Sequence, residues 1–324
     1  YGLTGYSDKT HGNIGLDMRY GLNSNSMMKL TFNPDFGQVE ADPSVLNLTA
    51  FETFYEEKRP FFSEGSEFFS HRISLFNSRR IGRSPNYNIP DDGELEGIPE
   101  YTTILGASRI MGSTSSGINY GFIGALTAEE SAIHVDSLGN RKKIVVEPMT
   151  NYSIGRIEVP MINKVSRFGI MTTNVSRKNN PGANVVGTDW ALGFYDNRLY
   201  TSGQLIQSNT NDIIGNAYIF RFGYLDPKWW SLRFWHGNSN EKFDINDLGY
   251  IWRSGHSYIG GRLELRKQEP WGRFINNNLE LKVDQGWNQD GLVIARGIDI
   301  EQDNLFSNYW SMGLFGKIFL PAYE

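Results

Sequence analysis

Apolar and polar residues alternate along most of the chain with a period of two. Near the N-terminus, Leu16, Met18 and Tyr20 are apolar, whereas Asp17 and Arg19 lie between them. Successive side chains of a β-strand point to opposite faces of a sheet. The alternation therefore predicts strands that each have one apolar face and one polar face.

The same pattern recurs to the C-terminus and is interrupted by turn sequences rich in Asn, Asp, Gly and Pro. It predicts about fourteen strands. We expect them at residues 14–21, 26–41, 101–111, 117–127, 151–160, 165–176, 187–195, 198–208, 215–224, 228–237, 257–267, 273–284, 291–302 and 306–319. Most have the roughly 9–11 residues that a tilted strand needs to cross a hydrocarbon layer.

The connections between the predicted strands alternate in length. Tight connections at Asp196-Asn197 and Asp226-Pro227 contrast with longer ones at residues 177–186 and 238–256. Short turns on one side and long loops on the other are typical of outer-membrane β-barrels.

A soluble β-sandwich or propeller also has alternating strands and is the competing interpretation. The predicted strands exceed the usual length of ~5–6 residues, and aromatic residues cluster near strand ends. Charged residues such as Arg233, Glu264 and Lys282 lie at mid-strand on the polar face, as expected for a watery lumen. We therefore predict an all-β fold, an antiparallel transmembrane β-barrel of about fourteen or more strands, as a single domain over residues 1–324.

The composition agrees with this prediction. The chain has 324 residues, a formal net charge of −5, 35 Gly and 14% aromatic residues. No stretch reaches the roughly 18 apolar residues of a membrane-spanning helix. The acidic balance, without a long Lys/Arg run, argues against a nucleic-acid partner. Cysteine is absent, which excludes disulfides and thiolate chemistry. Because the first residue is Tyr1, we expect a mature chain or an excised segment.

Residues 33–83 break the pattern. The apolar parity shifts by one residue after Gly37, which predicts a β-bulge. The shift places Asp35, Glu40 and Asp42 together on the polar face. A charged and aromatic segment follows, and we expect it to fold inward as a plug or constriction spanning residues 43–83.

The first part of this plug is predicted to be a short helical or irregular segment near residues 43–72. Asp42-Pro43 is typical of a helix start, and apolar residues at spacings of three and four predict an amphipathic helix over about 43–57. Pro60 is expected to end it.

Charged residues of the plug are the candidates for electrostatic selection of solutes, as charged rings act in channels. They are Glu56, Glu57, Lys58, Arg59, Arg79, Arg80 and Arg83, together with the lumen candidates Asp35, Glu40 and Asp42. On this hypothesis, neutralising Arg79 and Arg80 together changes the ion selectivity of the pore.

Two kinds of chemistry compete with this assignment. Glu40 and Asp42 lie two residues apart on one face, and paired carboxylates hydrolyse glycosides. With Asp35 they offer hard oxygen ligands for Ca²⁺, without any loop signature. We favour the simpler interpretation, in which these carboxylates line a polar lumen and pair with arginines. The five histidines are scattered, so neither a metal site nor a cofactor is predicted.

Trp229, Trp230 and Trp235 form an aromatic cluster close to a strand end. Their rings suit stacking on sugars, but an aromatic belt at the membrane interface explains them more simply.

Four motifs carry a resemblance to a known family. They are NPDFGQVEADPSVLNLTAFETFYEEKRPFF at residues 33–62, SRRIG at 78–82, VEPMTNY at 146–152 and NDLGY at 246–250. Over essentially its whole length the chain resembles the bacterial outer-membrane barrels of domain-of-unknown-function family 5916. In that family the barrel commonly follows a family-nine carbohydrate-binding domain, and members usually continue beyond the end of this chain. The resemblance thus implies a barrel incomplete at both ends, and it implies no particular reaction.

We therefore expect a non-enzymatic barrel in the bacterial outer membrane that admits a polar solute or docks an envelope partner. Its expected partners are outer-membrane lipid, an oligosaccharide or other polar solute, and other envelope proteins. The alternative is a cell-surface protein that binds or hydrolyses glycans through its lumen carboxylates. A third hypothesis is an anchor for a larger assembly, with residues 177–186 and 238–256 as docking loops.

Overall fold

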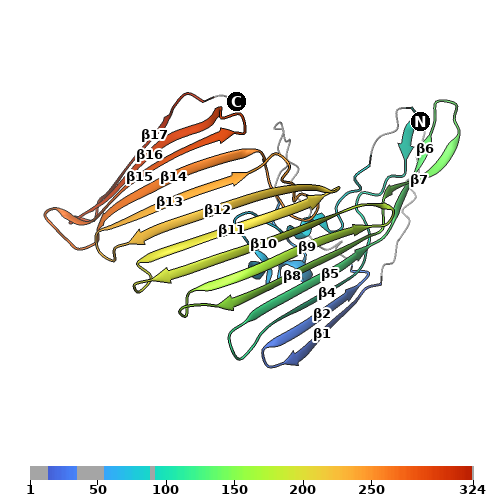
Figure 1. Ribbon diagram of the computed structural model, residues 1–324, viewed down its shortest axis with the longest axis horizontal. Helices are drawn as coiled ribbons and strands as arrows, with labels where there is room; N and C mark the ends of the chain where they lie inside the picture. Colours follow the sequence, from blue (N-terminus) through green and yellow to red (C-terminus); the bar gives the residue numbers. More distant parts are fainter. Residues whose placement is uncertain (1–13, 35–54, 88–91, 323–324) are drawn as a thin grey trace, which may run out of the picture.

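The computed structural model describes residues 14–34, 55–87 and 92–322. Fourteen strands form one antiparallel sheet (Figure 1). In spatial order they are β1 (Leu16–Asn23), β2 (Ser26–Phe32), β4 (Ile104–Ser113), β5 (Asn119–Thr127), β8 (Thr150–Pro160), β9 (Arg167–Arg177), β10 (Asn180–Phe194), β11 (Leu199–Thr210), β12 (Ile213–Leu225), β13 (Trp230–Ser239), β14 (His256–Lys267), β15 (Phe274–Asn288), β16 (Val293–Phe306) and β17 (Ser311–Phe319).

The order of the strands in this sheet follows the order of the chain, so the sheet is a meander of hairpins. Each of the fourteen predicted strand ranges overlaps one of its strands. The all-β, antiparallel prediction is confirmed, and period-two alternation was sufficient to find these strands.

The predicted long loop at residues 177–186 is wrong. Strands β9 and β10 are joined by a tight turn in which Asn179 has a φ of 61°. Pro181 and Gly182 suggested a loop, but they lie in a bulge where the register of β10 against β9 shifts between Asn180 and Ala183. A bulge is one of the places where a strand accommodates proline.

Within the described residues, the sheet is not closed into a barrel. β1 pairs only with β2, and β17 pairs only with β16, in the part of the chain that the structure describes. The two strands lie at opposite edges of the curved sheet (Figure 1).

The two faces of the sheet differ in chemistry, as the alternation predicts. In β15, Leu279, Leu281 and Val283 lie on one face with 37%, 39% and 45% of their surface exposed. The residues between them, Glu280 and Lys282, lie on the other face, where they form ion pairs with neighbouring strands. The apolar side chains thus lie on an uncovered face rather than between two layers.

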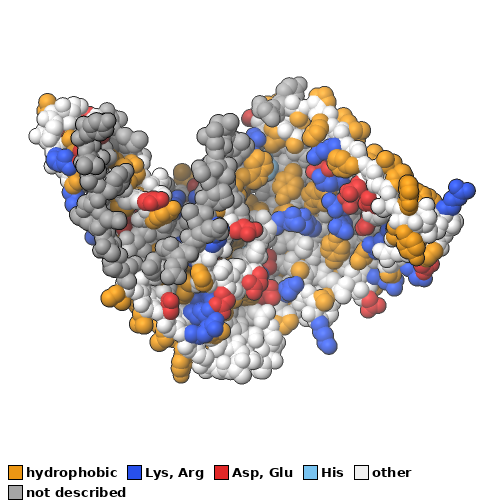
Figure 2. Space-filling model, turned by 180° about the vertical axis from the view of Figure 1, so that it is seen from behind, with side chains coloured by type: hydrophobic (Ala, Val, Ile, Leu, Met, Phe, Trp, Pro, Cys, Tyr) orange, Lys and Arg blue, Asp and Glu red, His pale blue; other side chains and the backbone are white. Residues whose placement is uncertain are grey.

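The polar face is hollowed, and Figure 2 shows Lys, Arg, Asp and Glu side chains gathered in it. The described part of the segment between β2 and β4 lies against this face. We call residues 55–83 the insert. It contains the short helix α1 (Pro60–Ser63) and two 3₁₀ turns, η1 (Ser66–Phe69) and η2 (Ser78–Arg80).

Apolar side chains join the insert to the sheet in one buried cluster. Phe62, Phe69, Leu75 and Ile81 are at most 1% exposed. They share the cluster with residues of the hollow face that come from β4, β5, β8, β9, β10, β11 and β12, among them Ile104, Ile123, Ile154, Met171, Val185, Ile206 and Ala217. The described part of the segment predicted as a plug thus packs against the polar face of the sheet.

The local structure of the insert differs from the prediction. Pro60 does not end a helix but begins α1, and residues 55–59 are not helical. Proline suits the first helical position because its fixed φ is helical and its missing N–H has no partner there. The rest of the predicted helix, residues 43–54, and the bulge predicted after Gly37 lie outside the described residues.

A second sheet was not predicted. It consists of β3 (Glu94–Glu96), β6 (Glu130–Val135) and β7 (Arg141–Glu147), in the order β3-β6-β7. It projects from the end of the large sheet that also carries the connection leading into β4 (Figure 1). No helix in the described ranges is long and apolar enough to cross a membrane.

Candidate functional site on the hollow face

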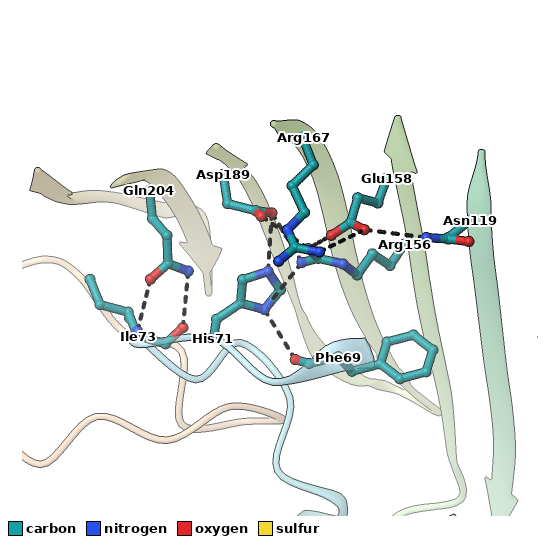
Figure 3. A network of polar contacts seen from close by, with 9 residues as sticks. All are labelled: Phe69, His71, Ile73, Asn119, Arg156, Glu158, Arg167, Asp189 and Gln204. Carbon is teal, nitrogen blue, oxygen red and sulfur yellow. Dashed lines mark hydrogen bonds and ion pairs between the residues drawn. The ribbon is translucent and has the colours of Figure 1, made fainter. Parts of the chain in front are cut away.

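A network of charged side chains lies where the insert crosses the middle of the sheet (Figure 3). Arg156 of β8 binds Asp189 of β10 through both guanidinium ends, with Nη1–Oδ2 at 3.0 Å and Nη2–Oδ1 at 2.9 Å. His71 of the insert contacts the same carboxylate, with Nε2–Oδ2 at 3.0 Å. One carboxylate of β10 thus holds both the insert and β8, which lies on the far side of β9 in the sheet.

The network continues along β8 toward the sheet end. Arg156 also contacts Glu158, with Nη2–Oε2 at 3.2 Å, and its guanidinium lies 5.3 Å from the ring centre of Phe68. Glu158 accepts a hydrogen bond from Asn119 Nδ2 at 3.3 Å and lies 4.0 Å from Arg167 Nη1. Buried charge-assisted bonds of this kind are strong when every partner is present, and costly when one is removed.

His71 is the titratable anchor of this network. Burial lowers the pKa of His71, and the positive charge of Arg156 lowers it further, which outweighs the opposite effect of Asp189. The imidazole is therefore neutral at pH 7. Its Nε2 lies 3.0 Å from Asp189 Oδ2, and its Nδ1 lies 3.0 Å from the carbonyl oxygen of Phe69 and 3.4 Å from Arg156 Nη1. The neutral ring carries one proton and therefore donates to only one of these two acceptors.

Two residues further along the insert, the backbone itself is bound. The side chain of Gln204 in β11 accepts from the N–H of Ile73 at 2.9 Å and donates to its carbonyl at 3.4 Å (Figure 3). Ser74 forms a β-bridge with Tyr250. The insert is thus attached successively to β8, β10 and β11 and to the loop that follows β13.

Glu57 and Arg59, both predicted as selectivity residues, form a clamp within the insert in which Glu57 is partly buried and Arg59 is buried. Arg59 binds Glu57 through Nε at 2.9 Å and Nη2 at 2.7 Å. It also donates to the carbonyls of Ser78 at 2.6 Å and Ile81 at 2.7 Å. Burial alone raises the pKa of Glu57, but the hydrogen bonds and charge of Arg59 outweigh this and hold the pKa below its usual value.

Glu64, which directly follows α1, ties the insert to the edge of the sheet. Its carboxylate receives Arg19 of β1 at 2.6 Å, Lys29 of β2, and Arg109 of β4 at 3.3 Å. Arg109 also donates to the carbonyl of Phe61 at 2.7 Å. Three consecutive strands thus converge on one carboxylate of the insert.

The remaining predicted charges of the plug lie apart from these anchors. Arg79 donates to the carbonyl of Glu56 from Nε at 3.0 Å and Nη2 at 2.6 Å. Arg80 is buried and donates to the carbonyl of Gly249 at 3.2 Å. Lys58 is exposed to solvent. The backbone carbonyl of Arg83 accepts hydrogen bonds from the backbone N–H and the hydroxyl of Thr102. The lumen candidates Asp35, Glu40 and Asp42 lie outside the described residues.

The tryptophan cluster is divided between the two faces. Trp230 is outward, with its ring centre 4.9 Å from that of Tyr224, and Trp229 is half exposed beside Lys267. Trp235, five residues along β13 from Trp230, lies on the hollow face opposite Arg221. The three rings therefore do not form one stacking surface.

The network attaches the insert to the sheet through side-chain and backbone contacts. Among the described residues, no group of three or more His, Cys, Asp or Glu side chains is placed to hold a metal ion. The His71–Asp189 pair has the spacing of a catalytic dyad, but no hydroxyl in the described ranges bonds to His71. A nucleophile adjacent to the base is the usual mark of covalent catalysis.

Sequence reasoning missed His71, Arg156, Asp189 and Gln204. The alternation of the strands could have identified the last three, because each is a polar residue at a position that the pattern assigns to the polar face. For His71 no local signal exists, because its partner lies 118 residues away.

Comparison with known proteins gives a family and no individual relative. A family model described as Domain of unknown function (DUF5916) matches residues 4–318. Neither a curated protein nor a solved structure matches the chain.

Proposed function

The chain belongs to the DUF5916 family, and we propose that its large sheet is the wall of an outer-membrane β-barrel through which a polar solute passes. The insert acts in this proposal as an inward-folded constriction. Both free edges of the sheet are completed by pairing with further strands.

The observation that carries this proposal is the uncovered apolar face of the sheet. It exposes large hydrophobic side chains from β1 to β17, including Leu16, Met18, Phe122, Ile157, Ile170, Leu205, Phe222, Leu232, Leu281, Ile300 and Leu314. A contiguous apolar surface of this extent marks an interaction with lipid or with another protein. Outer-membrane barrels present such a band to lipid and turn their polar face toward the lumen.

The lengths of the strands also support a location in the membrane. The strands from β4 to β17 in the large sheet have 9 to 15 residues, and a tilted strand of about 9–11 residues crosses the hydrocarbon layer. Hydrogen bonding between strands satisfies the backbone groups of the strands between β1 and β17, as a lipid environment requires.

The position of the insert supports its role as a constriction. It packs against the hollow face of β4–β12 and is attached to the sheet through Glu64, His71 and the backbone of Ile73. A segment held on a lumen wall reduces the free cross-section, and its charges bias which ions enter.

Conductance in a planar lipid bilayer tests the proposal. We expect the purified protein, together with the strands that complete the sheet, to insert into the bilayer. In the double variant His71→Ala/Gln204→Ala, the conductance should rise, because two attachments of the insert to β10 and β11 are lost. The matched control is His134→Ala/Gln302→Ala, which removes the same residue types from the small sheet and from the outward face.

Failure to insert would contradict the membrane assignment. Insertion with the same conductance in both double variants would contradict the role of the insert. Neutralising Arg79 and Arg80 is a less selective test, because Arg80 is buried and also holds the loop at Gly249.

A further inference from the structure

A second hollow lies on the polar face beyond the insert, between β11 and β15. Its volume is about 450 Å³, which falls within the range of about 300–1,000 Å³ for small-molecule sites. Five basic side chains line it, from Arg72, Arg221, Arg233, Arg262 and Lys282, and the only acidic side chain that lines it within the described residues is Asp284.

Three of these five cations are neutralised by neighbours. Arg233 lies 3.7 Å from Glu264, and Arg262 lies 3.2 Å from Glu280. Lys282 contacts Asp284 at 3.1 Å and Asp299 at 3.3 Å. These ion pairs join adjacent strands of the wall and account for the carboxylates nearby.

The other two cations, Arg72 and Arg221, are not neutralised in this way. Within the described ranges, no carboxylate lies in ion-pair distance of either guanidinium, and the Nε of Arg221 is buried without a hydrogen-bond partner. Arg72 comes from the insert and Arg221 from β12, yet both face the same hollow. Two like charges held together without a counter-charge attract an anion.

Three aromatic rings line the same hollow, and each lies over a glycine of the next strand. Tyr200 is paired with Gly223, Tyr258 with Gly237, and Trp235 with Gly260. A Cβ added to any of these glycines would lie within 3.0 Å of the ring. The glycines thus allow the rings to lie close against the wall, where they offer apolar surface beside the guanidinium groups.

The geometry points to a binding site for an anionic saccharide, a sugar that carries a carboxylate or phosphate, in this hollow. Guanidinium groups bind carboxylate and phosphate oxygens with directional, charge-assisted bonds. The aromatic surfaces suit the apolar face of a sugar ring, while Ser202 and the tyrosine hydroxyls suit its hydroxyl groups. This inference rests on the proposed pore and names the class of solute that it admits.

Binding is measured by isothermal titration calorimetry on the full chain in detergent. The probes are digalacturonate, glucose 6-phosphate, neutral maltose and inorganic phosphate. We expect saturable binding of at least one of the two anionic sugars and at least tenfold weaker binding of maltose and of inorganic phosphate. Carboxylate and phosphate are distinguished by which sugar binds more tightly.

The double variant Arg72→Gln/Arg221→Gln should weaken anionic sugar binding at least tenfold. The matched control Arg141→Gln/Arg198→Gln removes the same charge from exposed positions outside the hollow and should leave it unchanged. Equal binding of maltose, equal binding of inorganic phosphate, or equal loss in both double variants would each overturn the inference. Because binding is measured in detergent, these outcomes are separate from bilayer insertion and conductance, which test the proposed pore.

Discussion

At the scale of single residues, the hollow face depends on a few side chains that join distant parts of the chain. Asp189 binds both Arg156 and His71, and Glu64 forms ion pairs with basic side chains of three strands. Arg59 donates to the carbonyl groups of Ser78, the first residue of η2, and of Ile81, which follows η2. Removing one member of such a buried group leaves the others unpaired, which costs more than the pair itself contributes.

The protonation of His71 predicts a pH dependence of the insert. Because the pKa of His71 is lower in the folded state than its usual value of 6.5, the unfolded or detached state binds more protons as the pH falls through that range. The stability of the attachment is therefore fully present above pH 6.5 and is lost on acidification.

Hydrogen exchange of residues 60–83, corrected for the intrinsic effect of pH, measures this loss. We expect protection to fall between pH 7.5 and pH 5.5 in the native chain. In His71→Gln, whose amide also donates to Asp189 but does not titrate, the protection should change little. The same pH dependence in both proteins would rule out His71 as the titrating group.

At the scale of elements, the strands could be predicted from the sequence and the insert could not. The two faces of a strand differ in residue type along the strand itself. The alternation of Leu279, Glu280 and Leu281 therefore predicts both that a strand is present and which side chains share a face. The insert has little repetitive structure, and its position is set by contacts such as that of His71 with Asp189, which no local pattern encodes. Pro60 shows the same limit, because a proline is compatible with the end or the start of a helix.

Close backbone packing at one glycine predicts a large effect on the loop after β13. A Cβ at Gly215 in β12 would lie within 3.0 Å of the backbone of Lys242 and Phe243. Backbone atoms cannot move aside as a flexible side chain can. We expect Gly215→Ala to lower the free energy of unfolding by about 1–3 kcal/mol, in line with other overpacked sites.

Urea unfolding of the purified protein measures this difference. The control is Gly21→Ala in β1, where an added Cβ meets nothing within 4 Å; its effect should stay within about 0.5 kcal/mol. Equal urea concentrations at the midpoint of unfolding for the two variants would show that the loop is not closely packed against Gly215 of β12.

At the scale of the whole molecule, the sheet separates an apolar face from a charged one along fourteen strands. Closure could not be predicted from the sequence. It depends on strand number, tilt and the pairing of the edges, and the period of the pattern reports none of these. In the described part of the chain, the outer edges of β1 and β17 are unpaired.

The most direct test of the membrane assignment is site-directed spin labelling along β15. The chain contains no cysteine, so single cysteines at positions 279–284 can each carry a nitroxide without other changes. In lipid vesicles, collision rates with oxygen, which concentrates in lipid, and with a water-soluble nickel complex should alternate along the strand. The account predicts lipid contact at 279, 281 and 283 and water contact at 280, 282 and 284. Water contact at all six positions would contradict it.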